Sequence, residues 1–165
     1  HGQVQRMRVL GIDPGLRIAG YGCVSIEGNA ITPTIVEAGA IKLDTKASIS
    51  FRLEQLYDDL TEIIRELSPD LLAVVTIFAH EAHLSTAAIM GHARGIILLA
   101  GEQANLPLLE LTPTEIKKSV TGSGRATKDQ VQHAVAGLLK LNEPPQPPDV
   151  ADALAIAITA GIREH

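Results

Sequence analysis

The first apolar stretch of the chain constrains the fold most strongly, because it ends in a carboxylate. The aliphatic run at residues 9–12 predicts a short buried strand, and Pro14-Gly15 ends it with a sharp turn. Asp13 closes this strand, where an ionised carboxylate is costly unless it is paired or binds a cation. The simpler interpretation is that Asp13 caps the turn through nearby backbone. We favour a metal-binding or phosphate-facing aspartate because two further acids stand near the end of the chain.

The order of the predicted elements indicates the fold class. Strands are predicted over residues 8–13, 20–26, 34–43, 71–78 and 108–111, and helices over residues 48–67, 86–104, 112–121, 127–141 and 149–162, with a loop over residues 80–85. The first three strands are joined by short turns and should pair antiparallel, whereas the later ones alternate with helices. We therefore expect an α/β protein with a mixed five-stranded sheet and helices on both faces, which is the order of the ribonuclease H-like fold. In that fold the carboxylate of the first strand lies centrally, beside the next parallel strand and the last helix.

Composition limits the class of protein. The 165 residues are enough for one domain with a real core, so we predict a single domain over residues 1–165, with residues 1–6 as a leader or an added segment. Cys23 is the one cysteine, which excludes a disulfide within the chain and suits a reducing cytoplasm. No apolar run is long enough to span a membrane. The formal charge of −5 argues against nucleic-acid binding by bulk charge, so the local distribution of charge matters more.

A pair of acids opens the last predicted helix. Asp149 and Asp152 are three residues apart, so both carboxylates project from one face of its first turn. Asp149 alone could be an N-cap after the preceding prolines. Asp152 instead precedes a nearly all-apolar run, residues 153–158, that must be buried. Together with Asp13 these acids predict an oxygen-rich pocket of the kind that Mg²⁺ prefers. Two ions there could activate a water and stabilise the leaving oxygen of a phosphodiester.

Basic residues gather just before that helix. Residues 117–140 contain Lys117, Lys118, Arg125, Lys128 and Lys140 around a Gly-Ser-Gly loop. Clustered cations beside an acidic pocket are typical of proteins that bind a phosphate backbone. The alternative is that these side chains simply solvate exposed helix faces. We treat the cluster as a candidate DNA-binding surface.

Several short motifs, taken together, resemble a known family. They are Gly11-Ile12-Asp13-Pro14-Gly15, Gly20-Tyr21-Gly22, Gly91-His92-Ala93-Arg94-Gly95, Lys128-Asp129-Gln130-Val131-Gln132-His133 and Asp149-Val150-Ala151-Asp152-Ala153-Leu154-Ala155. In this order and spacing they are similar to the RuvC family of bacterial Holliday junction resolvases. The likeness runs from about Met7 to Ile162.

The resemblance implies an activity and its parts. The family is a homodimeric, Mg²⁺-dependent endonuclease, with Mn²⁺ as a substitute, that nicks two strands of a four-way DNA junction symmetrically and works with a branch-migration complex. By position, Asp13, Asp149 and Asp152 match its catalytic, metal-binding carboxylates. Phe78 matches an aromatic that wedges against bases near the crossover, and Lys117 and Lys128 match residues that hold the DNA backbone. The helix that begins near Thr86 resembles the dimer interface.

The chain departs from the family at one position. Counted back from Phe78, the family's catalytic glutamate falls on Val75, and valine cannot bind a cation or orient a water. The nearest later acid, Glu81, is displaced by six positions. We therefore expect junction binding with little or no cleavage, and keep a junction-binding protein without nuclease activity as an alternative. An actin-like or sugar-kinase-like nucleotide site is a further alternative, although the chain is too short for two lobes.

Overall fold

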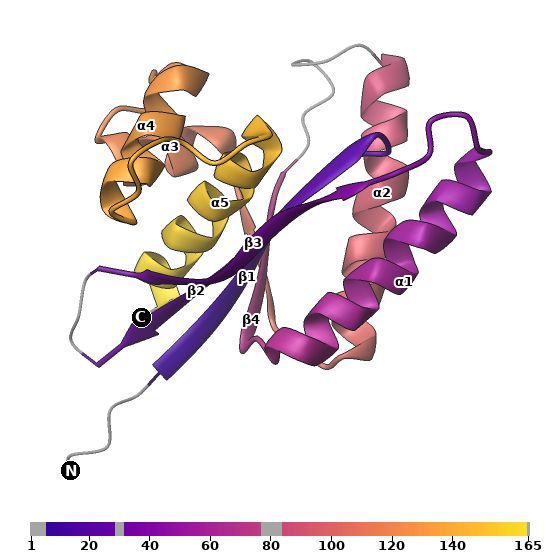
Figure 1. Ribbon diagram of the computed structural model, residues 1–165, viewed down its shortest axis with the longest axis horizontal. Helices are drawn as coiled ribbons and strands as arrows, with labels where there is room; N and C mark the ends of the chain where they lie inside the picture. The colour runs from indigo at the N-terminus through magenta and orange to yellow at the C-terminus, as the bar shows by residue number, and fades with distance from the viewer. Residues whose placement is uncertain (1–5, 29–31, 77–83, 165) are drawn as a thin grey trace.

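The computed structural model describes residues 6–28, 32–76 and 84–164 (Figure 1). The elements are β1 (Arg6–Asp13), β2 (Ile18–Glu27), β3 (Thr34–Lys42), α1 (Ile49–Leu67), β4 (Leu71–Val75), α2 (Leu84–Gln103), β5 (Leu108–Leu111), α3 (Pro113–Thr121), α4 (Lys128–Leu138) and α5 (Pro148–Glu164). The predictions for residues 1–5, for Phe78 and for Glu81 lie outside the described residues. Among the helices of the described ranges, none combines the length and the hydropathy that crossing a bilayer requires.

The sheet has the mixed topology that the sequence predicts. Its strand order is β3-β2-β1-β4-β5, with β1–β2 and β2–β3 antiparallel and β1–β4 and β4–β5 parallel. Short turns join the first three strands, which forces them to alternate in direction. The parallel pairs are reached through α1 and α2, as crossover connections require. β1 therefore lies in the middle of the sheet with Asp13 at its carboxyl end.

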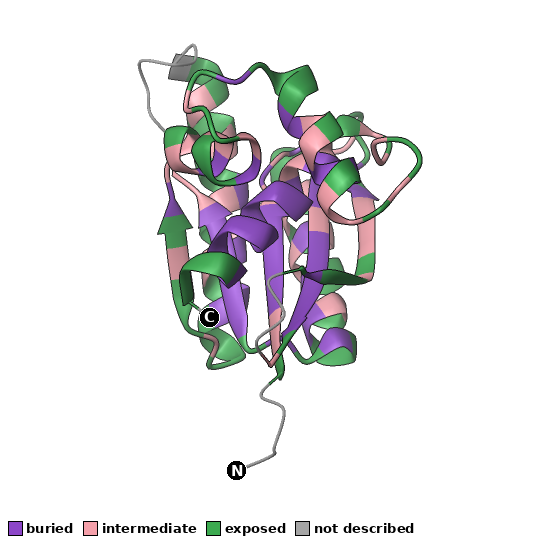
Figure 2. Cartoon of the chain, turned by 90° about the vertical axis from the view of Figure 1, so that its left-hand side faces the viewer, coloured by how far each residue is buried: buried purple, intermediate pink, exposed green. Residues whose placement is uncertain are grey.

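Helices cover both faces of the sheet, as expected (Figure 1). α1 and α2 pack on one face, where the buried side chains include Leu10 of β1 and Leu72 of β4. α3, α4 and α5 lie on the other, where α5 contacts the sheet most closely. α5 is buried along almost its whole length, and Figure 2 shows it as a continuous buried layer against the strands. Successive residues of a strand point to opposite faces, which explains why β4 is apolar at every position.

Local sequence signals fix the ends of several helices. The Ser48 side chain accepts the Phe51 N–H at the start of α1. Thr112 with Glu115 and Thr127 with Gln130 form reciprocal capping boxes at the starts of α3 and α4. The starts of α1, α3 and α4 agree with the predicted boundaries to within a residue. These caps hold α3 and α4 in fixed register beside the end of β1.

Several predicted boundaries were wrong by two residues or more, and three of them lie in β4, α4 and α2. β4 ends at Val75, and not at residue 78, because its partner β5 turns into α3 after Leu111; the last ladder contact is the Thr76 N–H donating to the Leu111 carbonyl at 2.8 Å. α4 ends at Leu138, and not at residue 141, because Lys140 adopts a left-handed conformation. α2 begins at Leu84, inside the predicted loop, a shift of two residues that helix ends commonly show.

Candidate active site

The site begins where β1 and β4 end side by side. Ile12 pairs with Val74 in the parallel ladder, so Asp13 and Val75 are the next residue on each strand. Both side chains point to the α5 face, since Val9, four positions before Asp13, and Ala73, two positions before Val75, pack in the core on that face. Val75 therefore occupies the position next to Asp13 on the neighbouring strand.

Glycines allow α5 to lie directly on these strands. A methyl group added to Gly11 of β1 would overlap the backbone of Ala153 and Ala157, and one added to Gly20 of β2 would overlap the backbone of Asp149. This close approach brings the first turns of α5 to the end of β1. Because α5 begins at Pro148, Asp149 lies within its first turn, and the N-cap interpretation of Asp149 was wrong.

The acids act on each other through burial and charge. The charged groups that act on Asp13 are Asp152, Asp149 and Lys128. Within the described residues, no hydrogen bond joins the Asp13 carboxyl to the Pro14–Gly15 turn, so the structure does not support the turn-capping interpretation. Burial, followed by repulsion from Asp152 and Asp149, raises the pKa of Asp13 to about 8. Burial also raises the pKa of Asp152, although Lys128 opposes that shift. In the absence of a cation, the raised pKa therefore favours the protonated form of Asp13 at neutral pH.

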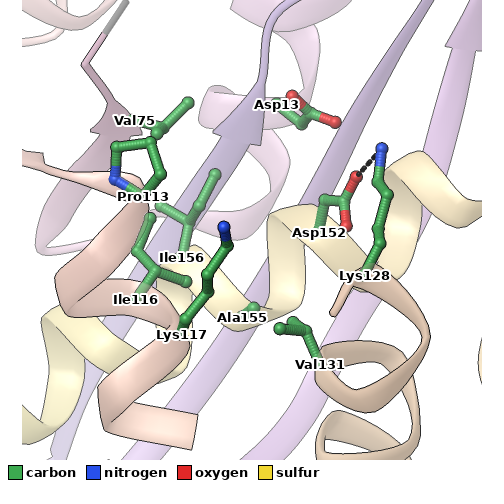
Figure 3. Close-up of a pocket in the computed structure, with 10 residues that line it drawn as sticks. All are labelled: Asp13, Val75, Pro113, Ile116, Lys117, Lys128, Val131, Asp152, Ala155 and Ile156. Atoms are coloured by element: carbon green, nitrogen blue, oxygen red, sulfur yellow. Dashed lines mark ion pairs between the residues drawn. The ribbon is translucent and has the colours of Figure 1, made fainter. Parts of the chain in front are cut away.

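Asp13 and Asp152 border a cavity of about 270 Å³ (Figure 3). It is lined by Asp13, Val75, Pro113, Ile116, Lys117, Lys128, Val131, Asp152, Ala155 and Ile156. Its polar groups come from four elements, and its wall is apolar. The sequence analysis did not identify the residues of this wall. Part of it could have been predicted, because Ala155 and Ile156 follow Asp152 by three and four positions and therefore lie on the same face of the helix.

The predicted basic residues separate into two groups. Lys117 and Lys128 line the cavity, and the Lys128 ammonium lies 3.3 Å from the Asp152 carboxylate. Lys118 and Arg125 are exposed and do not line it. Asp149 borders a neighbouring groove with Pro147 and Pro148, close enough to repel Asp13 and Asp152 electrostatically.

The donor set is that of an incomplete cation site. Within the described ranges, no three Asp, Glu, His or Cys side chains converge closely enough to hold a metal by themselves. Two carboxylates, Asp13 and Asp152, do converge. Mg²⁺ is commonly bound through one or two carboxylates, keeping waters and taking substrate phosphate to complete its shell. The residues present therefore fit a hydrated divalent cation, with Val75 adding methyl groups and no oxygen at the adjacent position.

Comparison with known proteins decides the family. The model of the family described as crossover junction endodeoxyribonuclease RuvC matches residues 9–160. The chain belongs to the RuvC family. The RuvC proteins of Halothermothrix orenii and Desulforamulus reducens are 45% and 44% identical to it, over 94% and 92% of this chain and 92% and 91% of theirs. This membership decides against the actin-like or sugar-kinase-like alternative.

Solved RuvC structures share the whole fold. Thermus thermophilus RuvC superimposes with a TM-score of 0.88 at 31% identity, covering 96% of this chain and 95% of that chain. T. thermophilus RuvC in complex with Holliday junction substrate superimposes with a TM-score of 0.87 at 30% identity, covering 96% and 94%. The predicted ribonuclease H-like architecture, with its mixed five-stranded sheet, is thereby confirmed.

Proposed function

We propose that this RuvC-family protein binds four-way DNA junctions as a homodimer in the cytoplasm, and that its nuclease centre cleaves them slowly or not at all. The observation that carries the proposal is Val75, which lines the same cavity as Asp13 and Asp152. The family resemblance supplies the substrate, the dimer and a branch-migration complex as the source of the junction.

The residues of the cavity have distinct roles in this proposal. Asp13 and Asp152, with Asp149 beside them, would hold a divalent cation, Mg²⁺ or Mn²⁺. When bound, the cation supplies positive charge that stabilises a phosphodiester under attack by water. Lys117 and Lys128 bind the phosphates on either side of the site. Lys118 and Arg125, which lie outside the cavity, extend the basic surface along the DNA backbone.

Val75 weakens cation binding and catalysis at the nuclease centre, because it lacks a negative charge and supplies no ligand at its position. A carboxylate at this point would add a fourth acid beside Asp13 and a ligand from the neighbouring strand. Valine instead leaves Asp13 without a partner on β4, so the cation is held from β1 and α5 alone. Small errors in the placement of reacting groups lower rates steeply, about a hundredfold for 1 Å. Junction binding, which depends on the basic surface, is not affected by this change.

The test is a nicking assay on a synthetic four-way junction in Mg²⁺, with junction affinity measured in Ca²⁺. We expect the wild-type chain to bind the junction with little cleavage. Val75→Glu should raise the cleavage rate by about a hundredfold or more, which is the scale of a mispositioned site, and leave affinity nearly unchanged.

The matched controls are Val75→Gln and Asp13→Asn in the Val75→Glu background. The glutamine has the shape of glutamate without its charge and should restore little cleavage. Asp13→Asn should abolish the restored cleavage. A wild-type rate that Val75→Glu leaves unaltered would show that another acid, such as Glu81, has taken the role, and the proposal would be wrong.

A further inference from the structure

The Asp152 carboxylate already has a cation beside it. Lys128 opens α4, and its ammonium lies 3.3 Å from the Asp152 carboxylate, at the edge of the cavity that Asp13 shares (Figure 3). The ammonium is held there by attraction to Asp152 above all, and also to Asp13 and Asp149. The ammonium thus takes the place of an external cation at this carboxylate.

The two members of the ion pair differ in their freedom to move. The Asp152 side chain is 20% exposed and stands on the buried helix α5, whereas the Lys128 side chain is 71% exposed. The backbone below Lys128 is fixed by the Thr127–Gln130 capping box, with bonds of 3.1 and 2.9 Å. Only the lysine side chain can therefore leave, and it can do so without disturbing either helix.

Opening the pair creates two requirements at once. A partly buried carboxylate that loses its counter-ion needs another positive charge, because burial penalises the ionised form. The released ammonium, now at the cavity mouth, is a strong partner for an anion such as a DNA phosphate. One movement of the Lys128 side chain would therefore pair its ammonium with a phosphate and leave the Asp152 carboxylate free to bind a divalent cation.

We propose that Lys128 is a built-in counter-ion that couples the two ligands: DNA phosphate draws the ammonium away from Asp152, and this exchange opens the carboxylates to the metal. The inference rests on the proposed function, in which Asp13 and Asp152 bind the cation and Lys128 contacts DNA. Without DNA, Lys128 holds the site closed to metal. Because coupling between two ligands is reciprocal, metal also strengthens junction binding.

Lys117 provides a matched control within the same cavity. It lines the cavity from α3, yet among the ion pairs of the described residues none involves Lys117. Removing either lysine deletes one positive charge near the acids. Only Lys128 should link metal binding to DNA binding, since only Lys128 contacts a ligand carboxylate.

The experiment measures Mn²⁺ affinity by isothermal titration calorimetry with and without a saturating junction carrying a non-hydrolysable linkage at the cleavage point. The proteins are the unsubstituted chain of 165 residues, referred to as wild type, and its Lys128→Ala, Lys128→Arg and Lys117→Ala variants. Without DNA, Lys128→Ala should bind Mn²⁺ about tenfold more tightly than wild type, within the usual range of coupling between sites. The junction should tighten Mn²⁺ binding by a similar factor in wild type, Lys128→Arg and Lys117→Ala. In Lys128→Ala the junction effect should be clearly smaller, because only the phosphate that completes the cation's shell contributes to it.

Two outcomes overturn the inference separately from the proposed function. Equal Mn²⁺ affinity of wild type and Lys128→Ala without DNA, or an equal junction effect in both, would show that the ion pair does not gate the metal, while the metal site itself stands. Absence of Mn²⁺ binding in all four proteins, or of junction binding in wild type, would overturn the proposed function and the coupling with it.

Discussion

At the scale of single residues, Asp13 lowers the stability of the fold at neutral pH while it supplies a carboxyl group to the candidate site. Its carboxyl is buried beside two other acids, and its pKa of about 8 compares with an ordinary value near 3.8. The folded protein therefore holds a proton that the unfolded chain releases above about pH 4. Stability from this group is fully present below pH 4 and is lost as the pH rises through about 8. A carboxylate retained at such a cost to stability is typical of a functional site.

We predict that Asp13→Asn stabilises the fold in the absence of metal. At pH 8 the change should add at least about 1 kcal/mol to the free energy of unfolding, or about 2–4 °C in Tm for a chain of this size. The reason is that the amide is neutral in both states, so folding no longer has to protonate or bury an ionised carboxylate. At pH 4 the gain should vanish. Thermal melts in EDTA across this pH range provide the measurement. Asp59→Asn on the exposed face of α1 is the control, and it should leave the Tm unchanged at both pH 4 and pH 8. A gain that is equal at both pH values would contradict the raised pKa.

At the scale of elements, the site depends on how closely α5 approaches β1. The contact is backbone against backbone at Gly11, where an added methyl group would overlap Ala153 and Ala157. Any widening of this contact moves Asp152 away from Asp13. The geometry of the acids is therefore encoded in a residue that carries no functional group.

Gly11→Ala should consequently affect both stability and the site. Overpacking of this kind costs about 1–3 kcal/mol, which urea denaturation would detect, and Mn²⁺ binding should weaken as the two carboxylates separate. Gly137→Ala in α4 is the matched control, since a methyl group there meets no atom within 4 Å and should add up to about 1 kcal/mol. If Gly11→Ala is as stable as wild type, the close contact is not needed.

The helices and strands could be predicted because the sequence signals that specify them are local. The arrangement of the site could be predicted only in part. Helical spacing placed α1, and the capping residue Thr127 placed the start of α4, from nearby residues alone. The unbroken apolar run of β4 carries no alternation, so which face Val75 takes follows from the sheet register with β1. The Lys128–Asp152 pair joins residues 24 positions apart through the packing of α4 on α5, which no periodicity reveals.

At the scale of the whole molecule, binding to DNA must overcome the net charge of −5. The protein meets this through local charge, since Lys117 and Lys128 face the cavity from α3 and α4. We predict that Lys117→Ala lowers the slope of log Kd against log salt by about one, the value for a single lost phosphate contact. Fluorescence anisotropy with a labelled junction would measure it. Arg65→Ala on α1, across the sheet, should leave the slope unchanged, and an unchanged slope in Lys117→Ala would exclude this contact.

The symmetry of a four-way junction requires two equivalent centres, so the last prediction concerns the dimer. Gly91, Gly95 and Leu99 recur every four residues along one face of α2. Methyl groups at the two glycines would meet no atom of the described chain within 4 Å, and Leu99 is 46% exposed. A second copy packed on this face would give the two-fold arrangement that most homodimers adopt.

We predict that the wild type sediments as a dimer at micromolar concentration, and that Gly91→Arg converts it to a monomer. The arginine projects from an open helix face, so the Tm of the single chain should stay unchanged. Its side chain should prevent the α2 helices of two copies from packing against each other. Gly137→Arg, equally open but on α4, should remain dimeric. Paired nicking by the Val75→Glu protein requires two centres on one junction, so Gly91→Arg in that background should leave single nicks. A wild type that sediments as a monomer would contradict the dimer itself, and a Gly91→Arg protein that remains dimeric would place the interface elsewhere.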